Sequence, residues 1–158
     1  MSAVAGGGPA RCPPGATDAI VGGVSTPIEV MQSYIAAARS GDFSAAYRFY
    51  SEDIVGHVPG RSAFAGELRG RQAVIGYIEH ARALSRDTDV ELNVVDMLAS
   101  DERVALIVRE VFHRSTGDVE IKRSNVYRVR GGQIVEISIY EANQYEVDAL
   151  VGSEPAAA

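Results

Sequence analysis

The sequence has little cysteine and histidine and no tryptophan. Cys12 is the single cysteine among 158 residues, and the three histidines show no close spacing with it or with one another. One cysteine cannot close an internal disulfide, and scattered His and Cys residues lack the spacing of a zinc site. We therefore expect Cys12 to be an idle thiol, and we predict no bound metal.

Long apolar runs and an excess of positive charge are lacking as well. No apolar stretch approaches the ~20 residues that span a bilayer, and no basic start followed by an apolar core marks a secretory signal. The net charge is −6 and the pI is near 5.0, whereas the surface of a nucleic-acid-binding protein is basic. We expect no membrane partner, no nucleic-acid partner and a cytoplasmic location.

Glycine, alanine and proline are concentrated at the start of the chain. Residues 1–25 have too little apolar surface to offset the entropy of ordering, which predicts a disordered tail. A functional arm is the alternative. The length suits one domain, which we place at 26–151, followed by a flexible tail at 152–158.

The second half of the chain consists of long alternating stretches. Apolar residues alternate along this part of the chain: Val104, Leu106 and Val108 point to one face of a strand, and the residues between them point to the other. The same period of two continues along the following stretches. Gly131 and Gly132 supply the positive φ that a tight hairpin turn needs. The predicted strands are 90–98, 102–114, 119–130 and 134–140.

The first half of the chain is predicted to be mainly helical. Thr26 can cap a helix, Pro27 suits its first turn, and Glu29 completes a capping box. The predicted helices start at 26, 42, 71 and 142, and a short strand spans 54–58, followed by a loop up to residue 70.

The order of these elements defines the fold class. Helices and one short strand precede four antiparallel strands, which is typical of an α+β domain with helices on one side of a sheet. A curved antiparallel sheet roofed by about three helices encloses a cone-shaped cavity, and concave apolar spaces of this kind bind small ligands. We therefore expect a small-molecule pocket.

Four stretches of the chain resemble motifs of the nuclear-transport-factor-like superfamily. They are Tyr34–Asp42, Tyr50–Gly60, Ala65–Val74 and Asn125–Glu136. The resemblance covers about residues 26–150 and is strongest to the SnoaL-like branch, which includes polyketide cyclases and is related to ketosteroid isomerase. The same scaffold supports enzymes, ligand-binding proteins and assembly domains.

His57 is the first catalytic candidate that the resemblance implies. Ketosteroid isomerases place a carboxylate base at the end of the corresponding short strand, where this chain has His57. Histidine side chains change charge near neutral pH and can therefore move protons. The alternative is a structural histidine that bonds the adjoining loop.

Tyr34 and Asn125 are the candidates for stabilising an enolate. Tyr34 corresponds, by the resemblance, to a tyrosine that donates to the developing oxyanion, and Asn125 to a second, protonated acid. An amide donates at any pH, although more weakly than an acid. The alternatives are a core tyrosine and an asparagine that satisfies buried backbone groups.

Glu141 is the second acid or base candidate, because it ends the last strand on the face of Ile137. Desolvation would raise its pKa; the alternative is an ion pair with an arginine at the rim. Arg123 and Tyr127 share the apolar face of their strand with Asn125 and are expected, with Ile137, to contact the substrate.

Arg109 is also predicted to contact the substrate, although its neighbour Glu110 competes for that role. Adjacent strand residues point to opposite faces, so only one of the two can line the pocket. The sequence leaves this choice open. The other residue would lie on the outer face, which commonly forms a dimer contact in this family.

The leading functional hypothesis is an isomerase or cyclase that abstracts a proton next to a carbonyl of a small apolar ligand. Hydrogen bonds alone would hold the enolate, so no cofactor is predicted. The alternative is a non-catalytic ligand-binding or self-association module, and a homodimer is expected in either case. Asn143 replaces an aspartate common in SnoaL-like sequences, which weakens transfer of the cyclase mechanism. Epoxide hydrolysis ranks third, because Ala105 replaces one aspartate of the Asp-Arg-Asp set in limonene-epoxide hydrolases.

Overall fold

The computed structural model describes residues 25–152, and the predictions for Cys12 and the two tails fall mainly outside them. The elements are α1 (Pro27–Arg39), α2 (Phe43–Tyr47), β1 (Tyr50–Val58), β2 (Gly66–Arg69), α3 (Arg71–Ala83), η1 (Arg86–Thr88), β3 (Val90–Ala99), β4 (Arg103–Phe112), β5 (Val119–Arg130), β6 (Gln133–Glu141) and α4 (Gln144–Val151).

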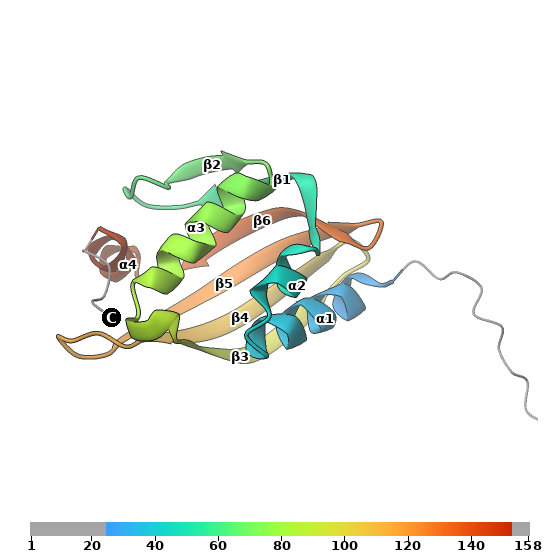
Figure 1. Ribbon diagram of the computed structural model, residues 1–158. Coiled ribbons are helices and arrows are strands. Elements are labelled where there is room, and N and C mark those ends of the chain that lie inside the picture. Colours follow the sequence, from blue (N-terminus) through green and yellow to red (C-terminus); the bar gives the residue numbers. More distant parts are fainter. Residues whose placement is uncertain (1–24, 153–158) are drawn as a thin grey trace, which may run out of the picture.

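A single six-stranded sheet carries the fold, in the order β2-β1-β6-β5-β4-β3. The helices α1, α2 and α3 lie on one side of it (Figure 1), so the predicted α+β class is confirmed. The sheet is mixed rather than antiparallel throughout, because β1 runs parallel to β6. β1 therefore lies between β2, the next strand in the chain, and β6, the last one.

β2 is the strand that the sequence did not reveal. Gly66–Arg69 pairs antiparallel with the end of β1, placing Leu68 opposite Gly56, whereas a loop was predicted there. Four residues are too short for an alternating pattern to stand out. The pairing extends the sheet beside α3, with which β2 is in contact.

The start of α1 confirms the predicted capping box. The Thr26 hydroxyl accepts a hydrogen bond from the backbone N–H of Glu29, and the Glu29 carboxylate accepts one from the backbone N–H of Thr26. Pro27 occupies the first turn. Because these contacts set where α1 begins, they also set which residues α1 turns toward the sheet.

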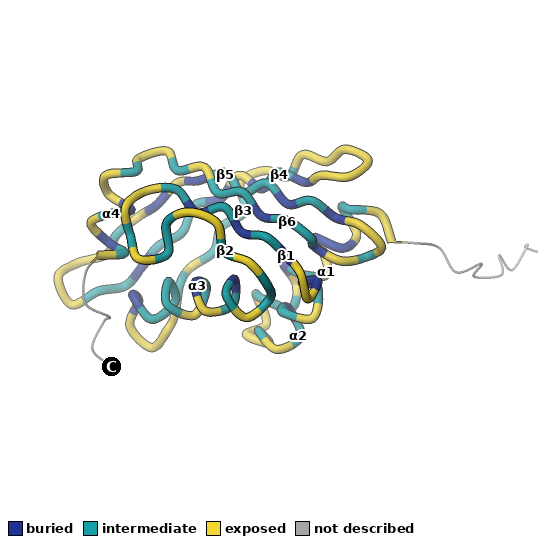
Figure 2. Tube along the Cα trace, turned by 90° about the horizontal axis from the view of Figure 1, so that it is seen from above, coloured by how far each residue is buried: buried dark blue, intermediate teal, exposed yellow. Residues whose placement is uncertain are grey.

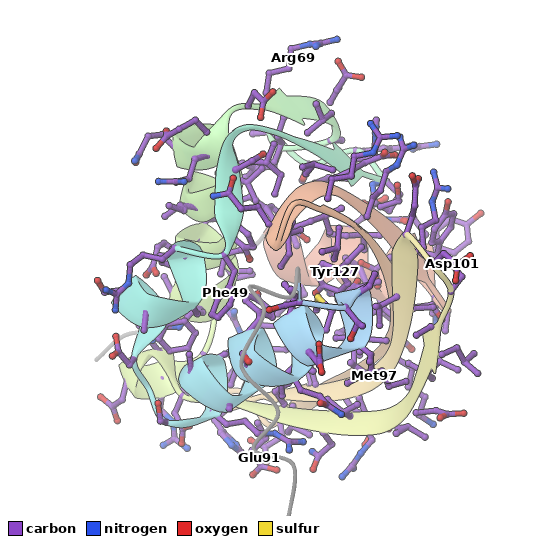
Figure 3. The ribbon with its side chains drawn as sticks, turned by 90° about the vertical axis from the view of Figure 1, so that its right-hand side faces the viewer. Phe49, Arg69, Glu91, Met97, Asp101 and Tyr127 are labelled. Atoms are coloured by element: carbon purple, nitrogen blue, oxygen red, sulfur yellow. The ribbon has the colours of Figure 1, made fainter. Side chains whose placement is uncertain are left out.

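Curvature of the sheet is marked by irregular pairing. The register shifts between Val94 and Asp96 in β3 and between Arg128 and Val129 in β5. An extra residue on one strand bends it and increases its twist. Seen along the sheet in Figure 3, the strands curl around the space in which α1 lies.

Two groups of buried side chains hold the layers together. Figure 2 marks the buried residues along the chain in dark blue. The larger group joins α1 and α3 to the inner face of the sheet, where Val104, Leu106 and Val108 confirm the predicted alternation. The smaller group packs α4 against the far end of the sheet, and its buried members are Leu84, Phe112, Ile121, Val147 and Leu150.

No helix within the described part of the chain has the length and hydropathy that crossing a bilayer requires.

Ile121→Ala tests the packing of α4. Ile121 is buried in the group that joins α4 to the sheet, so its truncation should lower the free energy of unfolding by about 2–5 kcal/mol. Urea denaturation measures the change. Lys122→Ala, on the exposed opposite face, is the control and should alter stability by no more than about 0.5 kcal/mol. Similar losses in the two variants would contradict the assigned faces.

Candidate functional site

A cavity of about 600 Å³ lies between the helices and the inner face of the sheet. Its size falls within the range of small-molecule sites. Residues from α1, α3 and all six strands line it, and most of them are aliphatic or aromatic. Tyr127 projects into this space beside α1, whereas Arg69 points away from the fold (Figure 3).

Three tyrosines form the wall of the cavity nearest α1. The hydroxyls of Tyr34 and Tyr50 lie 2.7 Å apart and share a hydrogen bond, and the Tyr34 ring packs 6.0 Å from that of Tyr127. Burial raises the pKa of all three phenols. They are therefore neutral near pH 7, and Tyr34 lies where the resemblance implied an oxyanion donor.

A buried arginine between two carboxylates forms the polar centre of the site. Arg123 Nε lies 3.4 Å from Glu110 Oε2 and 3.2 Å from Glu141 Oε2. The three side chains are 7%, 16% and 1% exposed, respectively. Each comes from a different strand: Glu110 from β4, Arg123 from β5 and Glu141 from β6. Glu141 lies directly across from Arg123 in the ladder.

One positive charge shared by two carboxylates makes the proton on Glu141 labile near neutral pH. Burial raises the pKa of Glu141 to about 7, with Glu110 and Asp148 contributing in the same direction and Arg123 opposing them. The carboxylates also offset the effect of burial on Arg123, whose pKa is raised, so the guanidinium stays charged. A buried charge needs such partners.

Several polar atoms of the site have no hydrogen-bond partner among residues 25–152. They include Asn125 Oδ1, and also Arg123 Nε and Glu141 Oε2, whose 3.2 Å ion-pair contact lacks the geometry of a hydrogen bond. Buried polar groups are normally paired. Because Asn125 lines the cavity, a ligand in the cavity could supply its partner.

The imidazole of His57 is turned toward the outer face of the sheet. Its Nε2 lies 3.5 Å from Glu136 Oε1, and a second oxygen of Glu136 lies 3.8 Å from Arg128. Arg128 and Glu136 pair across β5 and β6, next to the inward-facing pair Tyr127 and Ile137, so they occupy the opposite face. His57 borders the cavity, but its Nε2 atom points toward Glu136 and not into the cavity. Its predicted role as the base stays a prediction.

Arg109 lies outside the cavity, and its predicted contact with substrate is wrong in this structure. The Arg109 guanidinium pairs with Glu120 at 2.9 Å, and both side chains are exposed. Glu110 lines the cavity instead. The sequence offered a signal for Glu110, since it shares the parity of the buried residues Val108 and Phe112.

The remaining candidates divide between the cavity wall and the layer behind it. Five of them line the cavity: Tyr34, Arg123, Asn125, Tyr127 and Ile137. The strand residues were expected there from the faces they share, and Tyr34 from the family resemblance. Glu141 does not line the cavity; it lies behind Arg123, a lining residue with which it forms an ion pair.

Fold and cavity together define a nuclear-transport-factor-like, or cystatin-like, protein with an internal pocket. The sequence model of the SnoaL-like domain matches residues 31–137, and the chain belongs to this family. A search of curated proteins finds no match.

Solved structures support the same fold. A protein of unknown function with a cystatin-like fold from Xanthomonas campestris is 26% identical, with a TM-score of 0.72 over 82% of this chain and 100% of its own. TerC co-crystallised with polyporic acid is 14% identical, with a TM-score of 0.67 over 80% and 98%. Rv0760c from Mycobacterium tuberculosis, in complex with estradiol-17β-hemisuccinate, is 20% identical, with a TM-score of 0.61 over 73% and 94%.

Glu141→Gln tests the buried cluster through the pH dependence of stability. The folded state keeps a proton on Glu141 up to about pH 7, whereas the unfolded chain releases it near the ordinary pKa of 4.5. The wild-type free energy of unfolding, relative to that of the variant, should therefore fall by up to about 3 kcal/mol from pH 4.5 to 7 and stay level above. Urea titrations at several pH values measure it.

The control for this prediction is Glu120→Gln on the outer face, where a hydrogen bond from Arg109 lowers the carboxyl pKa. Compared with wild type, that variant should show no step between pH 5 and 7. A Glu141→Gln difference that is independent of pH would show that folding leaves the pKa of Glu141 unchanged.

Proposed function

We propose that the protein binds a small, largely apolar ligand bearing a carbonyl group and abstracts a proton from the carbon next to that carbonyl. The observation that carries the proposal is the Glu110–Arg123–Glu141 cluster beside neutral tyrosines in an apolar cavity. A carboxylate in such a site can accept a proton, and a phenol in such a site can stabilise the resulting oxyanion.

Each proposed step uses a group in or next to the cavity. The carboxylate cluster takes the α-proton, and the electron pair of the C–H bond moves onto the carbonyl oxygen. In this proposal Tyr34 donates a hydrogen bond to that oxygen, and the amide NH₂ of Asn125 donates a second. Return of the proton to another carbon gives isomerisation, while attack of the enolate on an electrophilic carbon of the same ligand gives ring closure.

Ligands of related folds support an apolar, oxygen-bearing ligand. Rv0760c binds a steroid hemisuccinate, and TerC was crystallised with polyporic acid. The mainly apolar lining of this cavity suits the same broad class.

Ligand binding and proton transfer are tested together. A thermal-shift panel of 2-tetralone, steroids, phenols and aromatic polyketides identifies binders, because a ligand specific to the folded state raises the melting temperature. For each ketone that binds, NMR in D₂O follows exchange of its α-protons with and without protein. We expect exchange well above background; binding without exchange would instead support the non-catalytic binding module.

Tyr34→Phe should lower the exchange rate by about 10²-fold, because it removes a donor aimed at the developing charge. The variant also leaves the buried Tyr50 hydroxyl without its Tyr34 partner, which should lower the free energy of unfolding by about 1–3 kcal/mol. Rates are therefore compared at a temperature at which both proteins are folded, and ligand affinity should change little. Tyr47→Phe is the matched control: its hydroxyl bonds Glu79, away from the Tyr34 hydroxyl, and its rate should stay near wild type. Equal rates for Tyr34→Phe and wild type would remove Tyr34 from the mechanism.

His57→Ala should retain most of the exchange rate, since its ring pairs with Glu136 on the outer face. A loss of about 10²-fold or more would assign the base to His57 after all.

The carboxylate–arginine–carboxylate arrangement favours epoxide hydrolysis as a second candidate. One carboxylate could activate water while the other, protonated, donates to the epoxide oxygen. The sequence placed this activity third because of Ala105, yet Glu110, Arg123 and Glu141 form a comparable set from other positions. Conversion of an apolar epoxide to its diol, without ketone exchange, would select this activity.

We also propose a homodimer that forms through the outer face of the sheet. Leu98, Ile107 and Tyr140 lie exposed on that face, on three different strands. Sedimentation at micromolar concentration should show a dimer, and Ile107→Lys should shift it toward monomer. A wild-type protein that sediments only as a monomer would overturn this proposal.

A further inference from the structure

We infer that the two carboxylates of the buried cluster have separate roles: Glu110 receives the proton from the ligand, and Glu141 acts through Arg123 as a positioning residue that regulates it. The inference rests on the proposed function and names the residues that carry it. The family resemblance implies neither a catalytic role for Glu110 nor separate roles for the two carboxylates.

Exposure to the cavity distinguishes the two carboxylates. The Glu110 side chain lines the cavity and is 16% exposed, whereas Glu141 is 1% exposed and is absent from the lining. Arg123 lies between them and contacts both. A ligand in the cavity can therefore contact Glu110 directly but reaches Glu141 only through Arg123.

Charge effects on the surrounding phenols place Glu110 at the centre of the site. The pKa values of Tyr34, Tyr77 and Tyr127 are raised mainly by burial, and the charge of Glu110 contributes to each of them. The charge of Glu141 contributes only to that of Tyr77 among the three. Glu110 therefore lines the same cavity as Tyr34 and lies close enough for its charge to act on that phenol.

Glu141 is enclosed on all sides by elements that isolate it from ligand. Arg123 of β5, Glu110 of β4, Tyr77 of α3 and Asp148 of α4 are the charged or titratable groups coupled to it. Asp148 is itself held in place, because its Oδ1 accepts hydrogen bonds from the backbone N–H of Arg61 and from the Gln144 side chain.

Close packing supports this enclosure. Gly60, at φ +95°, leaves no room for a Cβ, which would lie 2.2 Å from Asp148 Oδ1. The loop after β1 and the helix α4 therefore close the back of the cluster together, on the side of Glu141.

The ionisation of Glu141 then controls how firmly Arg123 holds Glu110. With Glu141 protonated, the full charge of Arg123 acts on Glu110. Once Glu141 ionises, the two carboxylates share one guanidinium, and Glu110 gives up that contact more readily to accept a proton. Proton abstraction should therefore accelerate as the pH rises through the titration of Glu141, which its raised pKa places near 7.

The test compares Glu110→Gln, Glu141→Gln and Glu141→Asp, with Glu120→Gln as the control. The measured quantity is the α-proton exchange rate of 2-tetralone from pH 5 to 9, corrected for background. Glu110→Gln should lose about 10²-fold or more at every pH while still binding 2-tetralone. Glu141→Gln should stay within about tenfold of wild type but lose the step near pH 7, and Glu141→Asp should restore a step.

A rate lost in Glu141→Gln at every pH, but kept in Glu110→Gln, would overturn the inference and make Glu141 the base. A step near pH 7 that persists in Glu141→Gln would overturn its regulatory role. Melting curves of each variant establish that it is folded under the conditions of the assay.

Failure of the proposed function gives a different result. In that case the wild-type protein does not accelerate α-proton exchange of any ketone. NMR of protein labelled with ¹³C-glutamate, without and with 2-tetralone, then shows which of the two carboxylates the ligand contacts. Movement of the Glu110 carboxyl signal alone supports its exposure to ligand, whereas movement of Glu141 alone, or of neither signal, overturns it.

Discussion

The site depends on one constraint, which is that the buried guanidinium of Arg123 must be balanced by nearby negative charge. A charge so far from water is tolerated only when partners surround it. Glu110 and Glu141 satisfy this need at 3.4 and 3.2 Å, but they introduce one negative charge too many. The raised pKa of Glu141 is the direct result of that excess together with burial.

Curvature of the sheet makes this arrangement accessible to a ligand. Shifts of register in β3 and β5 bend the sheet around α1, and the helices close the cone without filling it, which leaves a cavity of about 600 Å³. Apolar side chains line most of it, so electrostatic interactions there are stronger than in water. Tyr34 and Glu110 both line this apolar cavity. The Tyr34 hydroxyl can donate a hydrogen bond there, and the Glu110 carboxylate can accept a proton.

Local patterns predicted most of the fold. Alternation gave β4 and β5 within a residue or two, and the Thr26 capping box located the start of α1. The parallel pairing of β1 with β6 was missed because it joins strands far apart in the chain, for which no local pattern exists. In the site, Arg123 and Asn125 line the cavity as their shared face with apolar neighbours indicated, and Tyr34 lines it as the resemblance implied; their roles stay predictions.

By itself the sequence determined most of the elements, though not β2, together with the apolar faces and the family, because periodicity, caps and turns are local. Only the tertiary structure decided that Glu110 rather than Arg109 faces the cavity, and that the His57 ring meets Glu136 outside it. The parity of Val108 and Phe112 favours Glu110, but only the packed sheet shows that this face borders a cavity and that Arg109 pairs with Glu120 on the other face. The raised pKa of Glu141 likewise needs three strands to converge on one buried arginine.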